Sequence, residues 1–313
     1  MSIAFVFPGQ GSQSVGMLQE LHERHGVVRD TFTEASAALG FDLWALVANG
    51  PDTTLNETRN TQPAMLTAGV AVWRAWRTAG GAEPKLMAGH SLGEYTALTC
   101  AGAFEFADAV RLVAERGRYM QEAVPAGQGG MAAILGLDDD VVRQVCADSA
   151  QGEVVSAVNF NSPGQVVIAG SAAAVARAIE AAKAAGAKRA LPLPVSVPSH
   201  CALMHPAAER MALRLKEVKL QAPRVPVLHN VNVQSEQDAD AIRSALVRQI
   251  ESPVRWVETV QKIAAMGITR LVECGPGKVL AGLNKRIVKD TETLAVYDQA
   301  TLDAALAALR TGS

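Results

Sequence analysis

Short runs of apolar, β-type residues alternate with long helical patterns along most of this chain of 313 residues. Four such runs occupy residues 3–7, 86–89, 225–229 and 268–273. Helical periodicity separates them, most clearly over residues 63–78 and 104–123. Because parallel strands need a crossover connection, usually a helix, the alternation predicts a mostly parallel sheet covered by helices, an α/β fold.

Between residues 127 and 197 the order of predicted elements changes to strand, helix, strand, strand, helix, strand. This is the order of a ferredoxin-like α+β unit. Its second helix is expected to have Ser171 as N-cap and to end at Gly186. We therefore expect a small ferredoxin-like domain over 127–197, inserted into a large α/β domain formed by 1–126 and 198–313. A cleft between the two would suit a substrate.

Composition and charge exclude several classes of protein. The 29 Lys and Arg residues nearly balance 31 Asp and Glu, so nothing in the total charge favours nucleic acid or an anionic membrane. The N-terminal apolar run, 3–7, is too short for a signal peptide or a membrane span. The cysteines form no C-x-x-C pair, which argues against zinc and disulfides and predicts a cytoplasmic protein. They are Cys100, Cys146, Cys201 and Cys274.

Residues 89–93, Gly-His-Ser-Leu-Gly, match the G-x-S-x-G nucleophile elbow. An apolar run precedes the motif and a helical pattern, 92–101, follows it, as the motif requires. In such a turn Ser91 is strained with its Oγ exposed, and the glycines make room. The helix N-terminus also directs N–H groups, including that of Leu92, toward a developing oxyanion. The large domain is therefore expected to be α/β-hydrolase-like.

A serine nucleophile needs a base, and six histidines could supply it. His22 and His25 lie in a charged segment and are expected to be solvated, while His90 is directed away from its neighbour Ser91. His200 is best placed because it follows the return from the inserted domain, although the sequence leaves His205 and His229 open. No acid between serine and histidine looks like a triad member, so a Ser-His dyad is expected.

The helix expected at 104–123 places Arg116 on its apolar side. A buried guanidinium must be paired or must await an anion, because an isolated buried charge costs several kcal/mol. An ion pair within the protein and a substrate carboxylate are both open at this point. The second would fit a serine enzyme whose acyl group carries a free carboxylate.

The loop Pro-Gly-Gln-Gly-Ser-Gln at 8–13 follows the first predicted strand. It nearly matches a dinucleotide fingerprint, with an acid at Asp30, but Ser14 replaces the third glycine. A dinucleotide-dependent oxidoreductase is therefore a weak alternative. The other interpretation is that the loop brings its backbone or the Gln10 amide to the carbonyl under attack.

Several motifs together resemble the bacterial malonyl-CoA:acyl carrier protein transacylases. They are Phe-Pro-Gly-Gln-Gly-Ser-Gln at 7–13, Gly-His-Ser-Leu-Gly-Glu-Tyr at 89–95, Arg-Gly-Arg-Tyr-Met-Gln at 116–121, Asn-Phe-Asn-Ser-Pro-Gly-Gln-Val-Val-Ile-Ala-Gly at 159–170 and Pro-Ser-His at 198–200. The similarity runs essentially end to end, through Gln249 and Gly-Pro-Gly-Lys-Val-Leu at 275–280.

The resemblance implies a role for each of six residues. Ser91 would become malonylated, His200 would be general base and then acid, and Arg116 would bind the malonyl carboxylate. Gln10 would help shape the oxyanion hole with the Leu92 N–H as main donor, and the Gln249 carbonyl would orient His200. The implied substrates are malonyl-CoA and acyl carrier protein, with no metal or cofactor, in fatty acid biosynthesis.

Partners and alternative functions complete these expectations. A monomer that binds neither nucleic acid nor membrane is expected. Because acyl carrier proteins are acidic, five basic residues are the hypothetical docking surface: Lys188, Arg189, Lys285, Arg286 and Lys289. The last three are expected on a helix that follows the turn at 275–278. The alternatives are a serine thioesterase or hydrolase of acyl-CoA and a stand-alone acyltransferase of a polyketide pathway.

Overall fold

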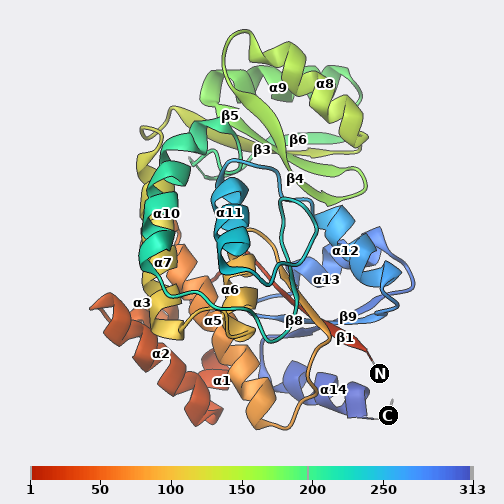
Figure 1. Cartoon of the computed structure of the whole chain (residues 1–313). Coiled ribbons are helices and arrows are strands. Elements are labelled where there is room, and N and C mark those ends of the chain that lie inside the picture. Colours follow the sequence, from red (N-terminus) through yellow and green to blue (C-terminus); the bar gives the residue numbers. More distant parts are fainter. Residues whose placement is uncertain (1, 196, 311–313) are drawn as a thin grey trace.

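The computed structural model describes residues 2–195 and 197–310. The outer limits of the predicted large domain, residues 1 and 313, and residue 196 in the predicted loop before His200 lie outside this description. Two separate sheets organise the described chain, one parallel and one antiparallel (Figure 1).

The parallel sheet has five strands in the order β7-β2-β1-β8-β9. They are β1 (Ile3–Phe7), β2 (Leu86–Gly89), β7 (Val227–Leu228), β8 (Arg270–Cys274) and β9 (Glu292–Val296). Every neighbouring pair is parallel, which confirms the predicted α/β class. The strand expected at 225–229 shrinks to two residues, and β9, a partly exposed edge strand, was not predicted because it lacks a continuous apolar run.

Helices cover both faces of this sheet. Phe5 and Phe7 of β1 face a core shared with α2, α5 and α7, whereas Ala4 and Val6 face a second core that includes Trp256. The helices of this part are α1 (Gln19–Arg24), α2 (Gly26–Leu39), α3 (Leu43–Asn49), α4 (Asp52–Leu55), α5 (Thr58–Thr78), α6 (Leu92–Cys100), α7 (Phe106–Glu122), α10 (His205–Glu217), α11 (Ala239–Ile250), α12 (Trp256–Ala265), α13 (Val279–Ile287) and α14 (Gln299–Arg310).

The antiparallel sheet has the strand order β4-β5-β3-β6. Its elements are β3 (Gly129–Leu135), α8 (Asp139–Ala150), β4 (Val155–Ser162), β5 (Gln165–Ser171), α9 (Ala172–Ala184) and β6 (Arg189–Pro192). Figure 1 shows α8 and α9 together on one face, where they enclose a core of their own. This arrangement confirms the ferredoxin-like α+β unit; its limits at 127 and 197 stay a prediction.

Three details differ from the sequence-based expectation. Helix α5 begins at Thr58 and not at Pro63, which lies inside it, and Thr61 and Gln62 of its first turns are buried. Ser171 occupies the N-cap of α9, but its hydroxyl donates to the carbonyl of Val154 instead of capping the helix. Lys289 lies beyond the end of α13 instead of on that helix.

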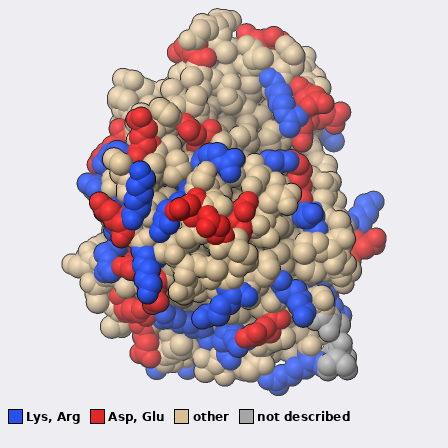
Figure 2. Space-filling view, viewed as in Figure 1, with Lys and Arg blue, Asp and Glu red and all other residues tan. Residues whose placement is uncertain are grey.

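The surface carries both signs of charge. Lys and Arg side chains are interspersed with Asp and Glu side chains on the face that Figure 2 shows. Exposed ion pairs such as Arg210 with Glu122, which joins α10 to α7, account for part of this mixture. In the part of the chain that the structure describes, no helix is long and apolar enough to cross a membrane.

Candidate active site

Ser91 lies in a sharp turn between the end of β2 and the start of α6. Its backbone angles, φ 51° and ψ −110°, are in a region that non-glycine residues rarely adopt. A Cβ on Gly93 would lie 2.0 Å from the carbonyl oxygen of Phe7, and one on Gly89 would lie 1.9 Å from the Gly93 backbone. The predicted strand, strained serine and helix are therefore all present, and both glycines are required by close backbone contacts.

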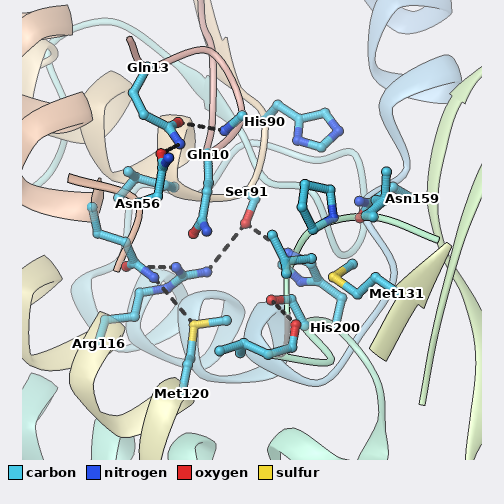
Figure 3. A pocket seen from close by; sticks show the side chains of 18 residues that line it. Gln10, Gln13, Asn56, His90, Ser91, Arg116, Met120, Met131, Asn159 and His200 are labelled. Atoms are coloured by element: carbon cyan, nitrogen blue, oxygen red, sulfur yellow. Dashed lines mark hydrogen bonds between the residues drawn. The ribbon is translucent and has the colours of Figure 1, made fainter. Parts of the chain in front are cut away.

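The serine hydroxyl and an imidazole lie within hydrogen-bonding distance. Ser91 Oγ is 2.7 Å from Nε2 of His200, and Nδ1 of His200 is 2.8 Å from the backbone carbonyl oxygen of Gln249. Because a carbonyl only accepts, Nδ1 carries the proton and Nε2 is left to accept from the serine hydroxyl. In Figure 3 a dashed line runs from Ser91 Oγ toward the His200 side chain.

The electrostatic environment keeps this imidazole neutral. His200 is 3% exposed, and its burial, together with the nearby positive charge of Arg116, lowers its pKa from 6.5 to about 3. The hydrogen bond to the Gln249 carbonyl acts in the opposite direction but is the smaller effect. A neutral Nε2 beside a hydroxyl is the state that a general base needs.

Arg116 lies inside the protein, as its position on the apolar side of α7 predicted. Its Nη1 donates to Oε1 of Gln62 and its Nη2 to Oε1 of Gln249, both at 2.9 Å. Nη2 also lies 3.5 Å from Ser91 Oγ, and Nε has no hydrogen-bond partner. Within the described ranges no carboxylate forms a salt bridge with this guanidinium, so neutral amides hold a positive charge beside the serine.

Gln10 and Leu92 also line this cavity. Leu92 is the first residue of α6, so its N–H belongs to the helix N-terminus beside Ser91. The Gln10 side chain lies 3.5 Å from the Thr58 hydroxyl, and Figure 3 shows it directed toward the space between Ser91 and Arg116. No helix starts at the glycines of this loop, since α1 begins at Gln19, and this does not fit a dinucleotide fingerprint.

The cavity has a volume of about 480 Å³. Its walls come from both sheets, because Met131 of β3 and Asn159 of β4 lie opposite Ser91 and Gln10. The cleft expected between the two units is therefore present. Asn159 is half-buried, and its Oδ1 is a buried atom without a hydrogen-bond partner in the described structure, which leaves an acceptor for a ligand N–H.

The remaining histidines have other partners. His22 and His25, expected to be solvated, are both partly exposed, and each also has a partner: the first stacks on Trp44 at 3.6 Å and the second bonds to Gln299 at 2.7 Å. His90 bonds to Asn161, His205 to Glu251 on the surface, and His229 to buried Glu94. Of the six, only His200 is within hydrogen-bonding distance of Ser91 Oγ in the described structure.

Three further residues of this site were not predicted from the sequence. Gln62 holds Arg116, and Glu94 and Asn230 form hydrogen bonds around the serine turn. The sequence signal for Glu94 is weak but present, since a lone acid stands in the first turn of the apolar segment 92–101. Gln62 and Asn230 come from segments remote in sequence and carry no local signal.

No group of His, Cys, Asp and Glu side chains in the described ranges is arranged to hold a metal ion. The four cysteines are free and buried.

Comparison with known proteins adds independent information. Residues 4–304 match the family described as the acyl transferase domain. The chain is 63% identical to the malonyl CoA-acyl carrier protein transacylase of Salmonella typhimurium over 97% of this chain and 98% of that protein. It is 45% identical to the Bacillus subtilis protein of the same description, over 98% and 97% of the two chains.

Solved structures give the same result. An acyl carrier protein S-malonyltransferase from Vibrio cholerae superposes with a TM-score of 0.95 at 60% identity, over 97% of this chain and 99% of that one. A malonyl-transacylase in complex with a type II polyketide synthase acyl-carrier protein superposes with a TM-score of 0.97 at 58% identity, over 98% and 100%. These findings confirm the family resemblance seen in the sequence.

Proposed function

The chain belongs to the acyl transferase family, and from this premise we propose that it moves the malonyl group of malonyl-CoA to acyl carrier protein through Ser91. The observation that carries the proposal is Arg116. Its buried guanidinium lies beside the nucleophile, donates to the amides of Gln62 and Gln249, and has no carboxylate partner among the described residues. That arrangement suits an acyl group with a free carboxylate, because a planar fork binds a carboxylate through two hydrogen bonds.

In the first half-reaction Ser91 Oγ attacks the thioester carbonyl. Its proton moves to Nε2 of His200, the C–S bond breaks, and the CoA sulfur leaves with that proton. Leu92 N–H and the Gln10 loop stabilise the oxyanion that forms on the carbonyl, and the Gln249 carbonyl keeps the imidazole in the required tautomer. The product is a malonyl ester of Ser91.

The second half-reaction reverses these roles. The phosphopantetheine thiol of the carrier protein gives its proton to Nε2 of His200, and its sulfur attacks the ester carbonyl. The C–O bond breaks and Ser91 Oγ takes the proton back, so the enzyme is restored. No metal or cofactor takes part in this scheme.

A serine thioesterase would use the same first step and then give the ester to water. The cavity lies between the two units and His200 is almost fully buried, which limits access of water to the ester. We therefore favour transfer to the thiol. A carrier of a polyketide pathway is a second candidate acceptor, since a similar solved structure contains one.

We also propose a cytoplasmic monomer. Four buried free cysteines suit a reducing compartment. The proposal of a monomer is based on the mixture of both charge signs on the face that Figure 2 shows.

Intact-mass analysis tests the reaction class. The protein mixed with malonyl-CoA should gain one malonyl group, Ser91→Ala should gain none, and addition of carrier protein should discharge the adduct. Release of free malonate without carrier protein, at a rate comparable to transfer, would instead identify a thioesterase.

A further inference from the structure

A fully buried carboxylate lies in the first turn of α6, close behind the nucleophile. Glu94 has no exposed surface and does not line the cavity. It accepts three hydrogen bonds: from Nδ1 of His229 at 2.7 Å, from the backbone N–H of Asn230 at 2.8 Å and from Nε2 of Gln249 at 2.9 Å. A buried carboxylate is retained only where such donors satisfy it, so the three partners belong to one unit.

The bond to Gln249 determines which way that amide points. Its Nε2 donates to Glu94 and to the Ser91 carbonyl, and its Oε1 accepts from Arg116. A carboxylate only accepts and a guanidinium only donates, so the amide fits between them in one orientation. The flipped amide would place its oxygen against a carboxylate and its NH₂ against a guanidinium.

The bond to Asn230 reaches the other side of the serine turn. With its N–H held by Glu94, Asn230 accepts from the Ser91 N–H through Oδ1 at 2.8 Å. Its Nδ2 donates to the Gly89 carbonyl at 2.7 Å. The strained turn is therefore braced on both sides of the serine.

We propose that Glu94 is a positioning residue that fixes the Gln249 amide and, through it, the Arg116 guanidinium that selects a malonyl group. It touches neither the reacting atoms nor the cavity, so it acts through Gln249 and Asn230. The inference rests on the proposed malonyl transfer and adds a residue that determines acyl specificity.

The test compares the ratio of kcat/KM for malonyl-CoA to that for acetyl-CoA in variants. Glu94→Ala leaves the Gln249 amide free to turn from Arg116, so the ratio should fall at least about tenfold, as expected for a residue that supports a binding group. In Glu94→Gln the ratio should stay within about threefold of wild type, because the new amide can keep all three hydrogen bonds if His229 changes its tautomer. Its amide oxygen can accept from Asn230 and Gln249, while its NH₂ donates to Nδ1 of His229 in the other tautomer.

Glu273 provides a matched control. It is also a fully buried carboxylate, in β8, and it accepts from the N–H groups of Leu280 and Ala281 at 2.9 and 2.8 Å, away from Gln249. Glu273→Ala should lower Tm and leave the ratio unchanged. If Glu94→Ala does not fold, Glu94→Asp carries the test, because it keeps a carboxylate but withdraws it by one methylene, and the ratio should again fall.

Two results would overturn the inference: a Glu94→Ala or Glu94→Asp ratio equal to that of Glu273→Ala, or a Glu94→Gln ratio as low as that of Glu94→Ala. The malonyl adduct of the wild-type protein is measured by intact mass in the same series. This measurement distinguishes failure of the Glu94 inference from failure of the proposed function. Absence of that adduct rejects malonyl transfer itself, whereas its presence with an unchanged ratio rejects only the role of Glu94.

Discussion

The backbone carbonyl of Gln249 accepts the Nδ1 proton of His200 at 2.8 Å, in the place where a carboxylate orients the histidine of a catalytic triad. A carbonyl fixes the tautomer as a carboxylate does, but it supplies no negative charge to stabilise an imidazolium. With Arg116 nearby and the imidazole buried, the charged form is disfavoured, which is why the pKa of His200 falls to about 3.

This low pKa predicts an unusual pH dependence for acylation. A base with an ordinary pKa of 6.5 loses activity about tenfold per pH unit as the pH falls below that value. His200 stays neutral down to about pH 3, so the single-turnover rate of Ser91 malonylation should be nearly constant between pH 5 and 8. Quenched-flow mass spectrometry of the adduct measures this rate. An inflection of the rate near pH 6.5 would contradict the lowered pKa.

Arg116 should determine the acyl group. Arg116→Ala removes the only cation beside Ser91 Oγ in the described site, so transition-state stabilisation for malonyl transfer should fall by about 3 kcal/mol or more. Activity with acetyl-CoA should rise relative to malonyl-CoA. The measurement is kcat/KM for both thioesters.

Arg118 is the control for that experiment, because it lies two residues along α7 and is exposed. Arg118→Ala should leave both rates unchanged. A malonyl-to-acetyl ratio in Arg116→Ala equal to that of Arg118→Ala would show that Arg116 is structural.

The turn glycines should be intolerant of even one methyl group. Gly93→Ala would place a Cβ 2.0 Å from a backbone oxygen that cannot move aside, so unfolding free energy should fall by about 3 kcal/mol or more. Gly282 in α13 is the control, since no atom beyond its own helix backbone lies within 4 Å of the place that a Cβ would take. Gly282→Ala should stabilise by about 0.4–1 kcal/mol. Denaturant titration measures both, and equal effects would contradict the steric argument.

Local sequence patterns predicted the parts of this site that depend on local geometry. The 89–93 motif places Ser91 because a strand, a turn and a helix are adjacent in sequence, and the period of α7 turns Arg116 inward. Which acceptor orients His200 depends instead on packing between remote segments. Gln62, Asn230 and Glu94 were missed for that reason, since an amide or acid carries no periodic signal for its partner.

The edge strand β9 was missed for a related reason. Its residues are half-buried and polar in part, so their conformation is set by pairing with β8 instead of by their own apolar pattern. The resemblance to a family supplied the role of Gln249, which residue patterns alone did not.

Part of the basic surface expected to bind the carrier protein gathers at one end of the antiparallel sheet. Arg189 of β6 and Gln165 of β5 both pair with Leu135 of β3. They therefore lie on either side of Leu135, each on a strand about 4.8 Å from β3. Arg286 of α13 donates to the Gln165 side chain at 2.7 Å. Residues remote in sequence thus place two arginines at the same end of this sheet, beyond the part of β3 where Met131 lines the cavity.

Reversal of these charges should weaken the second half-reaction specifically. Arg189→Glu/Arg286→Glu should lower kcat/KM for an acidic carrier protein by on the order of tenfold at low salt, with a smaller effect at high salt, because exposed charges mainly accelerate association. The rate of Ser91 malonylation should change less. Lys216→Glu/Lys219→Glu alters net charge equally at exposed positions on and just beyond α10, so an equal loss in this control would show that only total charge matters.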